Sequence, residues 1–292
     1  MSDLPIGVGD REAQKRFIAS HEAFLREFPE IRTLFDRVFT LTLEHYNEVP
    51  TGEQETTEAQ KAAETELRLA QIVVYSLART AFDDFGDLLL LAGNGRGIGA
   101  RKNLRGMYEH IVTAAFIAQN PAEATPFVEH AEVEKGKIWH RMVEANPDLT
   151  NELTPEETQD LERRYRQAQS KVKSEICKKC SQPVTQEAWT RVALDTMAAK
   201  VDTGAGTDLL KLYASCYLVP TFQSHPTAFG LQLRLEKTDT GLVYNELSEE
   251  TAHEMVVRGH DLILRLLTFL NDYFQLGLDA EVKARSEMFP KV

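Results

Sequence analysis

Residues 93–118 read GNGRGIGARKNLRGMYEHIVTAAFIA, and this stretch decides how the chain folds. Four glycines alternate with other residues at its start, so a helix that precedes the stretch must end there. From residue 98 the pattern predicts a new helix, because Leu104, Tyr108 and Ile111 fall on one face. From Met107 onward this helix is apolar on nearly every side. Such a helix is usually buried, so we predict that 98–118 is the central helix of the fold.

Three charged side chains interrupt this apolar helix at a spacing of four residues. Arg101, Arg105 and Glu109 therefore form one polar stripe along it. A carboxylate without a cation is very costly to bury, so we expect Glu109 to be mostly buried in a pair with Arg105 or Arg101. Two interpretations of the stripe stay open, a structural ion pair and a preorganised polar site in a helical bundle.

A basic cluster opens the same helix. Arg96, Arg101, Lys102 and Arg105 lie close together, with no acidic residue between them. The free N–H groups and the partial positive charge at a helix start add to these side chains, and together they can hold a phosphate. A solvated basic face is the alternative. The glycines before it do not match a nucleotide-binding loop, since G-x-G-x-x-G and G-x-x-x-x-G-K-[ST] are both absent.

The composition argues against several classes of protein. The chain has 292 residues, of which 42% are hydrophobic and 27% charged, as is typical of a globular protein. Its formal net charge of -12 argues against a coat on DNA or on an anionic membrane. Its 3 cysteines do not make a disulfide framework, and no apolar run approaches the ~20 residues of a membrane span. Because the N-terminus has no signal-peptide pattern, we expect a cytoplasmic protein without a membrane partner.

Helical patterns also dominate the rest of the chain. Apolar spacings of three, four and seven residues, together with capping residues, predict helices over 11–48, 58–92, from 120, 154–176, 186–200, 207–218 and 248–277. The connections between them are short. We therefore expect an all-α fold with one domain over 1–292, in which 1–57 is an N-terminal helical extension and 58–292 is the bundle core.

One stretch has a β pattern instead. Leu231, Leu233 and Leu235 alternate with polar residues, and Asp239-Thr240-Gly241 follows as a turn. A second strand can return after this turn. The sequence therefore predicts one small β-hairpin within 229–246.

Several residues on the central helix and beyond it resemble a large family of uncharacterised bacterial helical proteins. The family pattern is a helix of Arg-x-x-x-Arg-x-x-x-Glu type, then a Trp, then Tyr and Ser before a His-Pro turn. The helix 98–118 matches the first part, and the later elements in this chain are Trp189, Tyr213, Ser215 and Ser224-His225-Pro226. The spacing from Tyr213 to His225 is longer than in the pattern. Either Ser215 or Ser224 therefore corresponds to the serine of the pattern. The resemblance spans roughly 70–230 and implies a helical fold without a settled activity.

A second resemblance is to the HEPN superfamily (higher eukaryotes and prokaryotes nucleotide-binding), whose ribonucleases carry Arg-x(4–6)-His in a helical bundle. Arg105 and His110 fit that spacing. Gly106 departs from the polar residue usual at its position, and residues five apart lie about 140° apart on an ideal helix. The resemblance implies a HEPN-like bundle that cleaves RNA without a metal, with a composite site across a homodimer. We expect no cofactor.

This chemistry gives the candidate residues their roles. His110 is the expected general base or acid for the 2′-hydroxyl or the leaving oxygen, and Arg105 is expected to stabilise the charge of the phosphorane. Glu109 and His225 join the catalytic group, because the family resemblance pairs the His-Pro segment with the polar stripe. The residues expected to bind RNA or another phosphate-bearing ligand are Arg96, Arg101, Lys102, Tyr213 and Ser224.

Two functions from different classes remain. The first is a HEPN-like metal-independent endoribonuclease, as a toxin or a phage-defence effector. The alternative is a non-enzymatic helical module that binds an anionic small ligand or a partner protein. A sealed pair of Arg105 and Glu109 favours the module, whereas basic residues that reach into a cleft with His110 and His225 favour the enzyme.

Two further motifs give weaker signals. Cys177-Lys178-Lys179-Cys180 is a lone C-x-x-C, and a zinc site needs two more ligands. Glu250-Thr251-Ala252-His253 is a lone E-x-x-H, whereas a di-iron bundle needs two of these and two further glutamates. We therefore predict no metal site.

Overall fold

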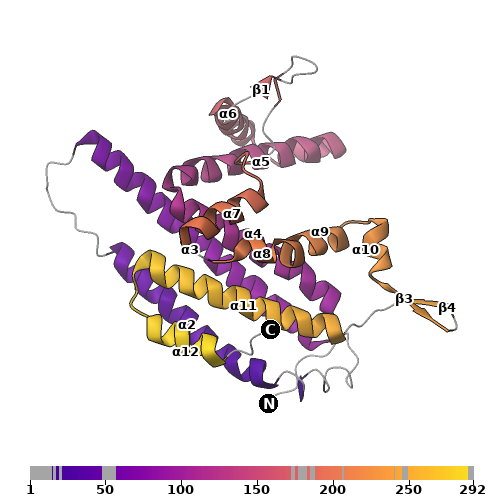
Figure 1. Cartoon of the computed structure of the whole chain (residues 1–292). Coiled ribbons are helices and arrows are strands. Elements are labelled where there is room, and N and C mark those ends of the chain that lie inside the picture. The colour runs from indigo at the N-terminus through magenta and orange to yellow at the C-terminus, as the bar shows by residue number, and fades with distance from the viewer. Residues whose placement is uncertain are drawn as a thin grey trace. The chain divides into compact units, whose positions relative to one another are not determined.

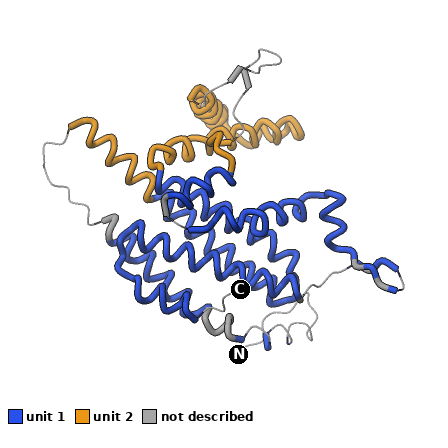
Figure 2. Tube along the Cα trace, viewed as in Figure 1, with its two compact units in different colours: residues 1–55, 72–119, 194–292 blue, residues 56–71, 120–193 orange. Residues whose placement is uncertain are grey.

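The computed structural model describes residues 15, 18, 19, 22–47, 57–171, 175, 176, 183, 184, 188–205, 207–239, 241–244 and 249–288. The chain forms two compact units (Figure 2). Unit 1 comprises Met1–Glu55, Ile72–Gln119 and Leu194–Val292, and unit 2 comprises Thr56–Gln71 and Asn120–Ala193. As predicted, the described residues are predominantly helical. The division at residue 57 and the single domain stay predictions.

The helix α4 (Gly97–Gln119) is central to unit 1, as predicted (Figure 1). It packs against α11 (Glu249–Phe274), against α7 (Leu194–Ala205) and against parts of the segment 209–224. Leu104, Met107 and Tyr108 are completely buried. Because α4 is buried on several sides, its polar side chains need partners from the helices around it.

Aromatic side chains join α2 (Glu22–Asn47) and α3 (Glu58–Gly93) to this core. Phe35 stacks on Phe82 with ring centroids 3.7 Å apart. Phe85 meets the ring of His260 edge-on, with centroids 4.8 Å apart. The helix α2 also packs against α11 and α12 (Asp279–Met288). The helix expected over 11–48 is thus built into the core of unit 1.

The segment expected as a helix over 207–218 is longer and has an irregular middle. The helix α8 (Leu209–Tyr213) passes into a π-turn, η3 (Ala214–Leu218), and then into α9 (Val219–Ser224). Pro220 gives the reason, because proline has no N–H and its ring collides with the carbonyl four residues earlier in a regular helix. In the π-turn the N–H of Val219 donates to the carbonyl of Ala214 instead.

The expected hairpin is present, but it is shorter than its pattern suggests. The strands β3 (Leu235–Thr238) and β4 (Gly241–Tyr244) pair antiparallel. The prediction of a strand through Leu231 is wrong, because that stretch forms the helix α10 (Ala228–Gln232). The hydroxyl of Thr227 accepts a hydrogen bond from the N–H of Gly230 at 3.0 Å, and this N-cap starts the short helix. A second antiparallel pair, β1 (Glu175–Ile176) with β2 (Pro183–Val184), is a feature that the sequence pattern did not predict.

Unit 2 contains η1 (Pro121–Glu123), α5 (Ala124–Ala145), η2 (Pro147–Asn151) and α6 (Pro155–Lys171). The predicted capping box opens α6: the N–H of Glu157 donates to Thr154 Oγ1 at 3.2 Å, and the N–H of Thr154 donates to Glu157 Oε2 at 2.9 Å. The helices α5 and α6 pack closely at Gly136, where a Cβ atom would lie 2.1 Å from the Tyr165 ring.

The helix expected over 186–200 begins later, at Leu194, as α7. Among the described residues, no helix combines the length and the apolar character that crossing a membrane requires.

Candidate functional site

The polar stripe of α4 forms the predicted ion pair. Nη2 of Arg105 donates to Oε1 of Glu109 at 3.0 Å. The Glu109 side chain keeps 37% of its surface exposed, so most of it is buried, as predicted, but the pair is not sealed from solvent. A pair that water still reaches, four residues apart on one helix, contributes little stability. The costly buried charge of this helix lies one turn earlier, at Arg101.

Arg101 pairs with a residue that the sequence pattern did not indicate. Its Nη2 donates to Oε2 of Glu254 on α11 at 2.6 Å, and its side chain is only 11% exposed. Glu254 also accepts from Nε of Arg258 at 2.9 Å, and Nη1 of Arg258 donates to the hydroxyl of Ser215 at 3.0 Å. This network ties α4, α11 and the π-turn together. Arg101 is therefore held in place by a structural contact.

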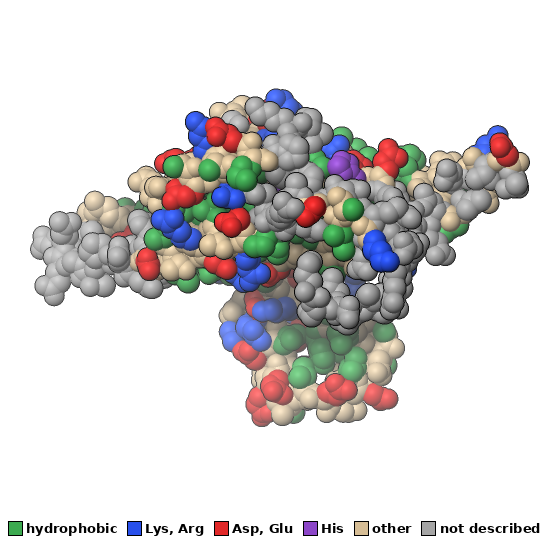
Figure 3. Space-filling model, turned by 90° about the horizontal axis from the view of Figure 1, so that it is seen from below, with side chains coloured by type: hydrophobic (Ala, Val, Ile, Leu, Met, Phe, Trp, Pro, Cys, Tyr) green, Lys and Arg blue, Asp and Glu red, His purple; other side chains and the backbone are tan. Residues whose placement is uncertain are grey.

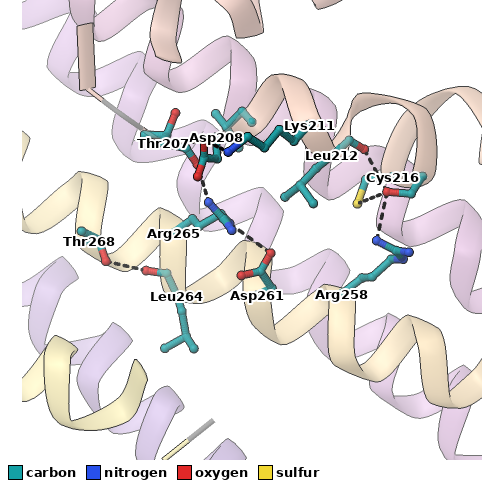
Figure 4. Close-up of polar contacts among 12 residues, drawn as sticks. Thr207, Asp208, Lys211, Leu212, Cys216, Arg258, Asp261, Leu264, Arg265 and Thr268 are labelled. Atoms are coloured by element: carbon teal, nitrogen blue, oxygen red, sulfur yellow. Dashed lines mark hydrogen bonds and ion pairs between the residues drawn. The ribbon is translucent and has the colours of Figure 1, made fainter. Parts of the chain in front are cut away.

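Figure 4 shows how α11 holds the segment before the π-turn. Arg258 and Arg265 both extend from α11 toward the stretch that contains Lys211, Leu212 and Cys216. Nη1 of Arg265 donates to the carbonyl of Thr207 at 2.5 Å, and its Nε donates to Asp261 at 3.0 Å. These contacts fix the position of the π-turn relative to α11.

Two tyrosines of this segment lie beside Arg105. The rings of Tyr213 and Tyr217 stack, with centroids 5.3 Å apart and an angle of 29° between their planes. The guanidinium of Arg105 lies over the Tyr217 ring, 5.3 Å from its centroid, in a cation–π contact. Tyr213 was among the predicted binding residues, whereas Tyr217 was missed. The spacing of four residues between two aromatic side chains is the signal that could have found it.

Tyr108 supports this stack from below. Its ring centroid lies 6.3 Å from each of the two other rings, and its hydroxyl donates to the carbonyl of Leu209 at 2.8 Å. Burial raises the pKa of the Tyr108 hydroxyl far above its usual range. Burial, and then the Asp195 carboxylate and Tyr217, also raise the pKa of Tyr213. Both hydroxyls therefore stay protonated at neutral pH.

His110 pairs with a carboxylate from α3. Its Nδ1 lies 3.1 Å from Oδ2 of Asp84, and both side chains are partly exposed. Gly106 explains this approach, because a Cβ atom there would lie 2.8 Å from the same carboxylate oxygen. The glycine that departs from the HEPN pattern thus makes room for Asp84. No spacing in the sequence links positions 84 and 110, so Asp84 was missed.

A carboxylate on one ring nitrogen of a histidine has a chemical consequence. It favours the tautomer that carries its proton on Nδ1, and Nε2 is then the free base of the imidazole. Arg105 and His110 lie five residues apart, about 140° around α4, so Arg105 contacts Tyr217 whereas His110 contacts Asp84 of α3. The arrangement offers a base beside α3 and a guanidinium against an aromatic ring on another face of α4.

The other predicted residues lie apart from these contacts. Lys102 is exposed on α4, and Arg96 lies in the turn before it. Ser224 donates to the carbonyl of Pro220 at 2.9 Å within α9, a bond that the helix itself explains. His225 ends α9 with an exposed side chain, and no contact within the described residues joins it to Arg105 or Glu109. The pocket expected to hold His225 with the polar stripe stays a prediction.

The cysteines give no reactive site among the described residues. Cys216 is completely buried in the π-turn, and burial raises the pKa of its thiol to about 11. A thiol of this kind is protonated and unreactive at neutral pH. Cys177 and Cys180 lie outside the described residues. Within those residues, no cluster of His, Cys, Asp and Glu side chains is able to hold a metal ion.

Charges are mixed on the molecular surface. On the face drawn in Figure 3, the described lysine and arginine side chains are interspersed with aspartate and glutamate. On this face the described side chains form no broad basic surface of the kind that coats duplex nucleic acid. On this face, binding of a phosphate-bearing ligand would rest on a few placed residues.

The chain is helical and has a polar cluster on its central helix. Comparison with known proteins identifies its family. The model of DUF5677, a family of unknown function, matches residues 71–242, which is more than half of the chain. The chain therefore belongs to this family, and the expected kinship with an uncharacterised helical family is confirmed. The matched region includes all of α4, Asp84 of α3 and the π-turn. No curated protein and no solved structure matches the chain.

Proposed function

We propose that the chain is a metal-independent endoribonuclease with a HEPN-like helical bundle, in which His110 moves the proton. The observation that carries this proposal is the contact between His110 Nδ1 and Asp84 Oδ2, at 3.1 Å. A histidine with one ring nitrogen held by a carboxylate and with a partly exposed side chain suits general acid–base chemistry.

Besides water, the proposed reaction needs only groups that this chain supplies. Nε2 of His110 takes the proton from the 2′-hydroxyl of RNA, and the 2′-oxygen attacks the neighbouring phosphorus. The bond to the 5′-oxygen breaks, that oxygen takes a proton from water, His110 returns its proton to water, and a 2′,3′-cyclic phosphate remains. Arg105 neutralises the charge that builds up on the phosphoryl oxygens. Its Nε is buried and lacks a hydrogen-bond partner among the described residues, so the phosphate contact is assigned to the terminal nitrogens of the guanidinium.

Glu109 is the partner of the Arg105 guanidinium before a ligand binds. It holds Arg105 Nη2 at 3.0 Å in the free protein, and the incoming phosphate competes with this carboxylate. As in the superfamily that the sequence resembles, we propose a homodimer, in which a second copy completes the site. We further propose a cytoplasmic toxin or phage-defence effector, because such a nuclease acts where cellular RNA is accessible.

A cleavage assay with the full-length protein tests the proposal. RNA is incubated with the protein in the presence of EDTA, and the products are separated by size. The wild-type protein should cleave the RNA, and His110→Ala should reduce the rate by about 10²- to 10⁴-fold. Asp84→Asn should lower the rate as well, because the tautomer is no longer fixed. His140→Ala, a partly exposed histidine in unit 2, is the matched control and should keep full activity. Equal rates for wild type and His110→Ala contradict the proposal.

One observation favours the alternative, a non-enzymatic module that binds an anionic small ligand or a partner protein. Both arginines of the polar stripe already pair with glutamates, Arg105 with Glu109 and Arg101 with Glu254. Binding of a phosphate-bearing ligand that depends on Arg105, without any RNA cleavage, supports this alternative.

A further inference from the structure

The rings of Tyr213 and Tyr217 stack on each other and are both partly exposed, and the guanidinium of Arg105 lies over Tyr217. The two rings come from α8 and the π-turn, and the guanidinium comes from α4, so these contacts join two separate parts of unit 1. Tyr108 packs beneath both rings and is itself completely buried. The position of the stack is therefore fixed by the core.

Positive charge lies against one ring of the stack. Arg105 covers Tyr217, whereas Arg258 donates to Ser215, which is two residues from each tyrosine and so lies on another side of the helical segment. Arg105 is paired with Glu109, and the Asp195 carboxylate lies near Tyr213. Flat rings beside guanidinium groups are the features with which proteins bind single-stranded nucleic acid.

We propose that Tyr213, Tyr217 and Arg105 form a base-stacking platform that selects single-stranded RNA. The inference rests on the proposed function and names the substrate class of the same site. An unpaired base stacks on the exposed part of the tyrosine rings, while Arg105 contacts a neighbouring phosphate. In a duplex the bases already stack on one another and are not free to use such a platform. Duplex RNA is therefore a poor ligand.

Binding to uncleaved RNA tests the platform separately from catalysis. The experiment measures the fluorescence anisotropy of a labelled oligoadenylate, alone or in a duplex with its complement. It uses the full-length His110→Ala protein, which leaves the RNA intact. The single strand should bind much more tightly than the duplex. Tyr213→Leu and Tyr217→Leu should each weaken single-strand binding by roughly 5- to 150-fold, the contribution of one stacked base.

Three control variants keep the test decisive. Tyr213→Phe and Tyr217→Phe retain the rings and should bind as well as the parent protein, so a loss confined to the leucine variants reports stacking. Tyr244→Leu removes an exposed tyrosine from β4 and should change nothing. If a leucine variant unfolds in a thermal melt, Tyr213→Trp replaces it and should bind at least as tightly as the parent.

The outcomes separate this inference from the proposed function. Ring-dependent binding of single strands without cleavage by the wild-type protein supports the platform and overturns the nuclease. Cleavage of RNA together with leucine variants that bind normally overturns the platform and leaves the nuclease in place. Equal affinity for single strand and duplex also overturns the platform.

Discussion

Asp84 reaches His110 across Gly106, a position of α4 that has no side chain. The carboxylate oxygen lies 3.1 Å from the imidazole nitrogen and would lie only 2.8 Å from a Cβ atom at Gly106. The glycine is thus part of the histidine site, although it carries no chemistry of its own. Its role is to let two helices place a carboxylate against an imidazole.

This contact predicts that the effect of Gly106→Ala on the free energy of unfolding depends on Asp84. In the wild-type chain the new methyl group displaces Asp84, and the cost of this displacement offsets the gain in helix propensity. In the Asp84→Ala chain the obstacle is gone, and Gly106→Ala should stabilise the protein by up to about 1 kcal/mol. Urea denaturation of the four proteins should give a coupling free energy of roughly 0.5–3 kcal/mol. Additive effects of the two substitutions would show that Asp84 makes no steric contact with a side chain at position 106.

Two glutamates with the same charge are predicted to differ in their contributions to stability. Glu254→Gln leaves Arg101 without a carboxylate at a site where the arginine side chain is 11% exposed, and Arg258 also loses its carboxylate partner. The loss in the free energy of unfolding should be roughly 1.5–3 kcal/mol. Glu109→Gln breaks only a part-buried pair within α4, whose arginine is 26% exposed, and should cost about 0.3–0.5 kcal/mol. Denaturant titration measures both losses, and a larger loss for Glu109→Gln contradicts the assignment.

Two helical glycines are predicted to respond oppositely to alanine. At Gly136 a Cβ atom would overlap the Tyr165 ring, so Gly136→Ala should destabilise the packing of α5 and α6 by about 1–3 kcal/mol. At Gly86 of α3 nothing lies within 4 Å of the new atom, so Gly86→Ala should stabilise the protein by up to about 1 kcal/mol. Thermal unfolding monitored by circular dichroism compares them. Replacing Tyr165 by alanine should remove the penalty at Gly136, and a penalty that persists would place the collision elsewhere.

Buried acidic groups predict a loss of stability at alkaline pH. The unfolded Cys216 thiol ionises near pH 9, whereas burial raises its pKa in the folded protein to about 11. Burial likewise raises the pKa of Tyr273 from 10.0 to about 12. The unfolded state therefore releases protons first, and stability that is fully present below pH 9 declines as the pH rises through these folded-state pKa values.

The Cys216 contribution to this decline should be roughly 2–3 kcal/mol between pH 9 and 11. Urea denaturation at a series of pH values measures it. Cys216→Ala lowers the stability at every pH by leaving a small cavity, but its decline over this range should be shallower. Parallel curves for the two proteins would show that the thiol does not contribute.

The sequence predicts contacts within one helix better than contacts between helices. The central position of α4 follows from its apolar residues, and the pair of Arg105 and Glu109 follows from their spacing of four. The contact between Arg101 and Glu254 joins residues that are 153 positions apart in the sequence. Local periodicity carries no information about pairs so far apart. Burial also depends on neighbouring helices, and for this reason the deeper burial of Arg101, which is 11% exposed, was not predicted.

Short elements were a second source of error. Leu231 and Leu233 alternate with polar residues as in a strand, yet five residues capped by Thr227 form α10. In so short a stretch the two patterns overlap, and a single capping hydrogen bond decides between them. Pro220 did carry a signal for an irregular helix, because a proline inside a helical pattern has to be accommodated locally.

The π-turn makes the segment around it more sensitive to deletion than to substitution. A π-turn holds one residue more than a regular helical turn, and each residue of an α-helix advances the chain by about 100° around the axis. Deleting one residue between Ala214 and Leu218 would remove the extra residue that accommodates Pro220 and would rotate Tyr213 relative to the residues that follow the turn. Val219–Ser224 would keep its place against α4. In related proteins the length of this stretch should therefore vary less than its amino-acid composition.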